Sequence, residues 1–209
     1  DADHDVSFAP SGAEFLDNYS RLDATPVTIV RRADGTLIHE VQKADASRLF
    51  AIGWKYPTPI IVKARDGITD LYGVLYRPSN FDSTKRYPIV DYIYPGPQTG
   101  PIGDRTFASG LGGSNAAMAQ LGFFVIEIDA MGTPFRSKAF HDSYYGHMGD
   151  NGLPDLVTGI KQMAVRIPQI DLNRVGIYGH SGCGFSSTDA MLRYPDFFKV
   201  AVSRAGNHD

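Results

Sequence analysis

Residues 174–184 (RVGIYGHSGCG) place a serine where it could act as a nucleophile. The apolar first half of the segment predicts a strand, and a helical pattern follows it at once, so Ser181 falls on the turn between the two. A serine on such a turn, flanked by small residues, is typical of a nucleophile elbow with the pattern G-x-S-x-G. Gly179 fits the first position, Cys183 occupies the last, and Gly184 follows one residue later. The segment therefore predicts Ser181 as the nucleophile of a hydrolase.

Three other interpretations of this turn stay open. A phosphate-binding loop would need a GxGxxG pattern or a P-loop lysine, and the sequence has neither. Ser181 could instead be a simple helix N-cap, or the turn could be the elbow of an inactive relative. His180 is not expected to be the base, because neighbours on a turn do not face each other. Cys183 is not expected to be the nucleophile, because it would lie within the first helical turn.

The elements around this serine predict a parallel sheet with crossover helices. Dense apolar runs predict strands at residues 88–94, 123–129, 174–178 and 199–203. Helical patterns lie between them, at residues 114–121, 156–167 and 182–194. This alternation, and strands that are apolar throughout, are typical of a sheet covered on both faces. A hairpin of strands 60–64 and 71–76 is expected before them, and the fold class is α/β.

The first fifty residues have a different texture. They contain short β segments separated by turn residues, with strands expected at 5–12, 13–19, 27–32 and 36–41. Asp34-Gly35 between the last two is a hairpin signal. A short helix is expected within 45–53. We therefore expect two regions, an all-β segment at 1–50 and an α/β region at 51–209; the first is either a subdomain of hairpins or a remnant of a larger β domain.

Composition excludes several classes of function. The chain has 209 residues, 43% of them hydrophobic, and a net charge of −3, so no basic surface exists to hold nucleic acid. Its apolar runs are too short to predict a membrane-spanning segment. Cys183 is the single cysteine, which excludes an internal disulfide, and the scattered histidines lack the spacing of a zinc site. No cofactor or metal is expected.

The ordered set of motifs resembles the prolyl oligopeptidase family of serine peptidases, most closely its dipeptidyl peptidase IV-type branch. The resemblance is carried by DYIYPGPQ at 91–98, IDAMGT at 128–133, the segment 171–184 and the segment 194–203. Residues 5–41 resemble the last blade of the β-propeller that precedes the hydrolase domain in these enzymes. Three positions depart from the family pattern: Met131 replaces a usual Arg, Phe135 a common Gly, and Cys183 the Gly of the elbow.

The resemblance implies an α/β-hydrolase fold and a serine peptidase that acts on short peptides through an acyl-enzyme on Ser181. Elbow geometry makes the backbone N–H of Gly182 one oxyanion donor, and the resemblance makes the Tyr94 hydroxyl the other. Release of N-terminal dipeptides, with proline or a small residue in the penultimate position, is implied, as is a periplasmic or extracellular location. An esterase or acylaminoacyl peptidase on the same fold, and a non-catalytic fragment or pseudoenzyme, are the alternatives.

The base of the catalytic triad is expected to lie outside this chain. In α/β-hydrolases the order is Ser, Asp, His, and the only downstream candidates, Asp196, His208 and Asp209, do not fit it. We therefore expect a sheet that is incomplete at the C-terminus, with the strand at 199–203 unpaired on one edge. Such an edge favours self-association or pairing with the missing C-terminal part, and the chain alone is expected to be inactive.

Overall fold

A computed structural model of the chain describes residues 2–94, 96–103, 105–109, 115–147, 149 and 151–208. These residues form two compact units. The first comprises residues 2–58 together with 105–109, and the second comprises the described residues of 59–103 and 115–208. The assignment of residues 1–50 to a propeller blade stays a prediction.

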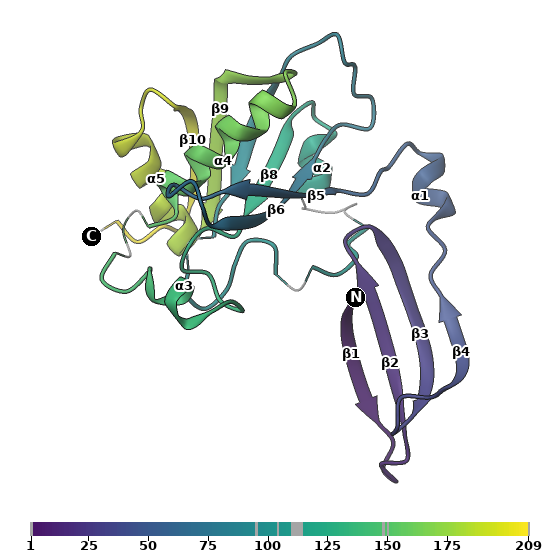
Figure 1. The fold of residues 1–209 in the computed structure, drawn as a ribbon. Coiled ribbons are helices and arrows are strands. Elements are labelled where there is room, and N and C mark those ends of the chain that lie inside the picture. Colours follow the sequence, from purple (N-terminus) through teal and green to yellow (C-terminus); the bar gives the residue numbers. More distant parts are fainter. Residues whose placement is uncertain are drawn as a thin grey trace. The chain divides into compact units, whose positions relative to one another are not determined.

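The first unit is built on a four-stranded antiparallel sheet with the strand order β1-β2-β3-β4 (Figure 1). Its strands are β1 (Asp3–Phe8), β2 (Glu14–Arg21), β3 (Ala24–Arg32) and β4 (Leu37–Lys43). The predicted Asp-Gly hairpin joins β3 to β4: Gly35 has φ +88°, and the Asp34 carboxylate accepts from the Thr36 N–H at 2.9 Å. Because Gly has no Cβ, it adopts this left-handed conformation without strain.

Aromatic side chains pack beside this sheet within the first unit. The ring of Trp54 lies 5.1 Å from that of Tyr56 and 5.8 Å from that of Phe107, centroid to centroid. The backbone N–H of Phe107 also donates to the hydroxyl of Ser20 on β2 at 3.0 Å. The short helix α1 (Ser47–Ala51) contributes Phe50 to the same cluster, 5.8 Å from Trp54. These contacts attach residues 105–109 to the first unit, which the sequence did not predict.

The second unit contains a six-stranded sheet with the order β10-β9-β7-β8-β6-β5. Its strands are β5 (Thr58–Lys63), β6 (Asp70–Tyr76), β7 (Tyr87–Tyr92), β8 (Phe124–Ile128), β9 (Ile170–His180) and β10 (Phe198–Arg204). The pairs β10–β9, β9–β7 and β7–β8 are parallel, whereas β6 pairs with β8 in the antiparallel sense. The predicted α/β class and mostly parallel sheet are therefore confirmed, and β10 lies at the edge of the sheet as expected.

Helices cover both faces of this sheet. The helices of the unit are α2 (Asn115–Ala119), α3 (Lys138–Asp142), α4 (Leu153–Arg166) and α5 (Gly182–Arg193). Gly159 of α4 packs against Ile128, whereas Asn115 of α2 is hydrogen-bonded to Glu127. Successive residues of a strand point to opposite faces, so α4 and α2 lie on opposite sides of β8. Figure 1 shows α5 beginning directly at the end of β9.

The helix α3 was not expected from the sequence, and the expected start of α2 lies outside the described residues. No helix was expected at α3, where the Ser137 hydroxyl caps the first turn by accepting from the Phe140 N–H at 3.2 Å. A helix of five residues is too short to show a period of 3.6. The helix expected at 114–121 is observed as α2, and Ser114 lies outside the described residues. Among the described residues, no helix is long and apolar enough to cross a membrane.

Candidate active site

Ser181 lies between β9 and α5 with a strained backbone. Its φ and ψ are +61° and −122°, a combination that non-glycine residues rarely adopt. Two backbone hydrogen bonds fix the turn: the Ser181 N–H donates to the Arg204 carbonyl at 2.8 Å, and the Phe185 N–H donates to the Ser181 carbonyl at 3.0 Å. The residue is exposed. The predicted strand-to-helix turn with an unusual backbone is confirmed, and this geometry is that of a nucleophile elbow.

The close approach of strand and helix explains the small residues around Ser181. A Cβ added to Gly179 would lie 2.2 Å from the Cβ of Cys183. A Cβ added to Gly184 would lie 2.7 Å from the carbonyl oxygen of Arg204. Larger residues at these two glycines would push β9, α5 and β10 apart. Cys183 fits at the usual glycine position because Gly179 opposite it has no side chain.

Cys183 is unsuited to nucleophilic attack in this arrangement. It is buried inside the core of the second unit, and burial raises the pKa of its thiol. A thiolate is the reactive form of cysteine, so a raised pKa and a buried sulfur both lower its reactivity. Ser181, by contrast, is exposed at this turn, and its role as nucleophile stays a prediction.

A cavity of about 420 Å³ brings the three predicted site residues together. Its lining residues are Tyr94, Gly96, Pro97, Gln98, Tyr144, Gly149, Ser181, Gly182, Phe185, Ser186 and Asn207. Tyr94 follows β7, and its hydroxyl is 3.4 Å from the Nε2 atom of Gln98, which donates to it. No atom outside the adjoining chain lies within 4 Å of a Cβ built on Gly182, so this glycine borders open space. The roles assigned to Ser181, Tyr94 and Gly182 stay predictions.

Two cavity walls were missed by the sequence reasoning. Phe185 lies four residues after Ser181, on the same face of α5, and helical spacing alone could have identified it. Tyr144 follows α3, the helix that was not predicted, so its position had no signal in the pattern. Both rings contribute apolar surface beside the candidate nucleophile.

No histidine of the described chain is hydrogen-bonded to Ser181. His180 precedes Ser181 on β9 and is exposed. His208 stacks on the Phe185 ring, with centroids 6.4 Å apart, and its Nε2 lies 3.0 Å from the Ser203 hydroxyl. Asp209 lies outside the described residues. The described residues also contain no group of three or more His, Cys, Asp and Glu side chains that could hold a metal ion.

A buried polar network lies beneath the elbow strand. The carboxyl of Glu127 on β8 is hydrogen-bonded to Asn115 and Tyr76, and the Tyr178 hydroxyl donates to the Asn115 side chain. Burial, with a smaller contribution from the charge of Asp129, raises the pKa of Glu127 to about 8. Glu127 is a polar residue in an otherwise apolar strand, and its hydrogen-bonding partners in this network account for its burial.

Comparison with known proteins gives consistent matches. Residues 112–209 match the model of the prolyl oligopeptidase family. Human dipeptidyl peptidase 8 is 37% identical over 65% of this chain, which covers 15% of that protein. An Aspergillus oryzae protein assigned as dipeptidyl-aminopeptidase B is 28% identical over 90% of this chain, which covers 21% of it. A Bacteroides ovatus crystal structure assigned to dipeptidyl aminopeptidase IV matches the whole chain with a TM-score of 0.86 and 29% identity, over 29% of its own length.

The fold and the turn at Ser181 define an α/β-hydrolase unit that follows an antiparallel β segment. Residues 112–209 match the prolyl oligopeptidase family, and the relatives similar to this chain are dipeptidyl peptidases, which confirms the predicted resemblance to this family and branch. The chain spans less than a third of the length of these relatives.

The departure at Phe135 acquires a physical meaning in the structure. Phe135 has φ +68° and a side chain that is 92% exposed. A positive φ is the conformation that glycine adopts most easily, and glycine is the residue that the resemblance leads us to expect at this position. Phe135 therefore holds with strain a backbone conformation that glycine would adopt freely.

Proposed function

We propose that this chain carries the nucleophile and the oxyanion hole of a serine peptidase that releases dipeptides from the N-termini of short peptides. One observation carries the proposal: Ser181 is held at φ +61° on an exposed turn, at a cavity that Tyr94 and Gly182 also line. Strain of this kind costs about 1–3 kcal/mol and persists at functional sites because the surrounding structure enforces it. The dipeptidyl peptidase relatives supply the substrate class.

In this proposal the Ser181 Oγ attacks the carbonyl carbon of the scissile bond. Its proton passes to a histidine, which returns it to the departing amine, and the acyl group stays on Ser181 until water releases it. The backbone N–H of Gly182 and the hydroxyl of Tyr94 donate to the oxyanion that forms on the carbonyl oxygen. The proposal takes the histidine and its orienting carboxylate from outside residues 1–209, since no histidine of the described residues is hydrogen-bonded to Ser181 and His208 is engaged with Ser203 and Phe185.

Active-site labelling tests the nucleophile. We expect a fluorophosphonate to label the full-length protein that contains this sequence and to label its Ser181→Ala variant not at all. We expect the isolated 209-residue chain to label slowly, because loss of triad partners costs roughly 10⁴- to 10⁶-fold in turnover. Rapid labelling of that chain would show that it already holds a base, with His180 and His208 as the first candidates. Labelling that survives Ser181→Ala would refute the assignment.

A tyrosine pair tests the oxyanion hole and the substrate class. Tyr94→Phe removes one donor, and we expect kcat to fall by about 10²- to 10³-fold. Tyr92→Phe is the matched control. Tyr92 lies two residues earlier and lines a different cavity, which Glu127 also lines. Equal effects of the two changes would contradict the role of Tyr94.

A panel of dipeptide amides and acyl esters, assayed with the same proteins, separates a dipeptidyl peptidase from an esterase or acylaminoacyl peptidase.

A further inference from the structure

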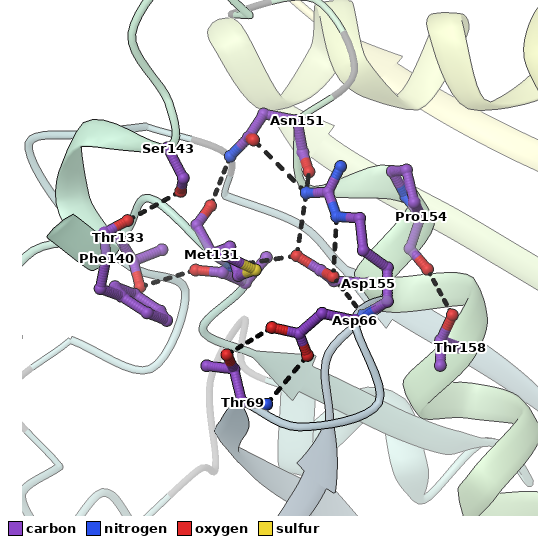
Figure 2. Close-up of polar contacts among 12 residues, drawn as sticks. Asp66, Thr69, Met131, Thr133, Phe140, Ser143, Asn151, Pro154, Asp155 and Thr158 are labelled. Atoms are coloured by element: carbon purple, nitrogen blue, oxygen red, sulfur yellow. Dashed lines mark hydrogen bonds and ion pairs between the residues drawn. The ribbon is translucent and has the colours of Figure 1, made fainter.

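A fully buried carboxylate lies at the start of α4. Asp155 has 0% relative exposure, and its oxygens accept four hydrogen bonds. Its Oδ1 accepts from the backbone N–H of Arg65 at 2.8 Å and from Arg65 Nε at 3.1 Å. Its Oδ2 accepts from Arg65 Nη2 at 3.1 Å. The same Oδ2 accepts from the Met131 N–H, also at 3.1 Å (Figure 2). A buried charge is stable only when it is paired and hydrogen-bonded, so Asp155 depends on Arg65.

The same guanidinium is connected to the loop that follows β8. Arg65 Nη2 also donates to the backbone carbonyl and side-chain oxygen of Asn151. The Asn151 amide in turn donates to the Met131 carbonyl, so the Met131 residue is held at both its N–H and its C=O (Figure 2). Arg65 itself belongs to the turn between β5 and β6 and is partly exposed. A single cation therefore holds α4 and the loop after β8 in one arrangement.

This loop is in direct contact with a wall of the Ser181 cavity. Gly132, the residue after Met131, has φ +96°. A Cβ at this glycine would lie 2.7 Å from the Cβ of Tyr144 and 2.9 Å from the Asn151 side-chain nitrogen. Tyr144 lines the cavity together with Ser181. With no space between the loop and Tyr144, a displacement of the loop would move the cavity wall.

We propose that Arg65 is a positioning residue for the Ser181 cavity. Through its bonds to Asp155 and Asn151 it holds the loop after β8, and this loop in turn fixes the position of Tyr144. The proposal rests on the proposed function, in which this cavity takes the substrate. Arg65 is the cation that pairs with Asp155, and position 131 of the loop, where the resemblance leads us to expect Arg, is Met. Met131 already donates its N–H to Asp155 and, with Arg65, lines one further cavity of about 390 Å³, so an arginine side chain at position 131 would start beside Asp155 and next to open space.

The test moves the positive charge from position 65 to position 131 in the full-length protein. We expect Arg65→Met to raise KM for a dipeptide amide by on the order of 10- to 100-fold, with a smaller change in kcat, because a displaced wall misplaces bound substrate. The double variant Arg65→Met/Met131→Arg restores the cation from the loop, and we expect most of the loss to be recovered. Arg174→Met is the matched control: it removes an exposed arginine paired with Asp171 at 2.8 Å and should leave KM unchanged.

Hydrogen exchange of the segment 129–147 provides a readout that does not depend on activity. We expect faster exchange in Arg65→Met and a return to the original rate in the double variant. If Arg65→Met does not fold, Arg65→Met/Asp155→Asn removes both charges and is expected to fold with the same fast exchange. Unchanged KM and exchange in a folded Arg65 variant would overturn the proposal, as would losses that Met131→Arg fails to restore. If the fluorophosphonate labels no serine of the protein, the proposed function fails. The exchange data still decide whether Arg65 holds this loop.

Discussion

The two sheets of this chain reach stability in different ways. In the antiparallel sheet of the first unit, every residue of β1 and β4 is exposed, and Phe8 is 63% exposed. Its most buried polar group, Asp17, is held by His4 at 2.7 Å and by Arg31 at 3.1 Å. In the second unit, by contrast, every residue of β8 is buried. The strained Ser181 turn occurs in the unit that has a large apolar core, because only a rigid surrounding can enforce strain.

Truncating one aromatic ring in each sheet is the strongest test of this difference. Phe124 on β8 is 1% exposed and packs against the ring of Phe81 at 5.8 Å. We expect Phe124→Ala to lower the free energy of unfolding of the second unit by about 3–5 kcal/mol. Phe8→Ala removes the same ring from an exposed position and should cost less than about 1 kcal/mol.

Urea titrations followed by hydrogen exchange, read separately in peptides of each unit, measure both costs. A second expected result is that Phe124→Ala slows labelling of Ser181, while Phe8→Ala does not. Equal losses from the two changes would show that the exposed face of the antiparallel sheet is covered in the full-length protein.

Two buried carboxyl groups of the second unit and an exposed carboxyl group of the first unit have pKa values shifted in opposite directions, which makes pH a second test. Burial raises the pKa of Asp91 and of Glu127 to about 8 in the second unit. In the first unit, hydrogen bonds from Thr36 lower the pKa of Asp34. Asp91 and Glu127 therefore keep their protons in the folded state at pH values where the unfolded chain has lost them.

The sign of the pH dependence follows from this difference. Between about pH 4.5 and pH 8 the folded second unit binds more protons than the unfolded chain, so its stability falls as the pH rises. The expected slope is about 1.4 kcal/mol per pH unit for each group. Asp34 contributes stability above its unfolded pKa that is lost only in acid, so it adds no slope in this window.

Urea midpoints of the second unit at pH 5, 6, 7 and 8 measure this slope. We expect Glu127→Gln and Asp91→Asn each to flatten it and Asp34→Asn to leave it unchanged. A second unit whose stability is constant or rises across this range would contradict the buried, protonated state of both carboxyls.

How far the sequence predicts this site depends on the distance between interacting residues. Ser181, Gly179 and Gly184 lie within one strand-turn-helix segment, so local pattern and elbow chemistry identify them. Tyr94 came from the resemblance, because no local rule links a strand-end tyrosine to a distant serine. The Arg65–Asp155 pair joins residues 90 positions apart, and a turn arginine offers no sign of its partner.

The sequence predicts the fold to about the same extent as it predicts the candidate site. Apolar runs and helical periods identified the strands of both sheets and the two long helices, α4 and α5. The short helix α3 and the attachment of residues 105–109 to the first unit were not predicted, because both are set by tertiary contacts of a few residues. Wherever a contact depends on packing of distant segments, sequence periodicity gives no information about it.

Relief of backbone strain is the smallest effect and tests why the strain is kept. In the hairpin turns of the first unit positive φ falls on Gly12 and Gly35, and Arg105 is that unit's non-glycine example; in the second unit Ser181 and Phe135 are among the non-glycine residues with positive φ. Glycine adopts positive φ freely, so we expect Phe135→Gly to raise the free energy of unfolding by about 1 kcal/mol. The side chain is 92% exposed, so little packing is lost.

Ser181 allows the same comparison at the site itself. Ser181→Ala and Ser181→Gly both remove the hydroxyl, but only glycine relieves a φ of +61°. We expect the glycine variant to be the more stable of the two by about 1 kcal/mol, reduced by the extra entropy that glycine adds to the unfolded chain. Urea titration of these two variants and of the parent protein measures the differences. If Ser181→Gly is no more stable than Ser181→Ala, the turn stores no strain at Ser181, and the main structural argument for its role as nucleophile is lost.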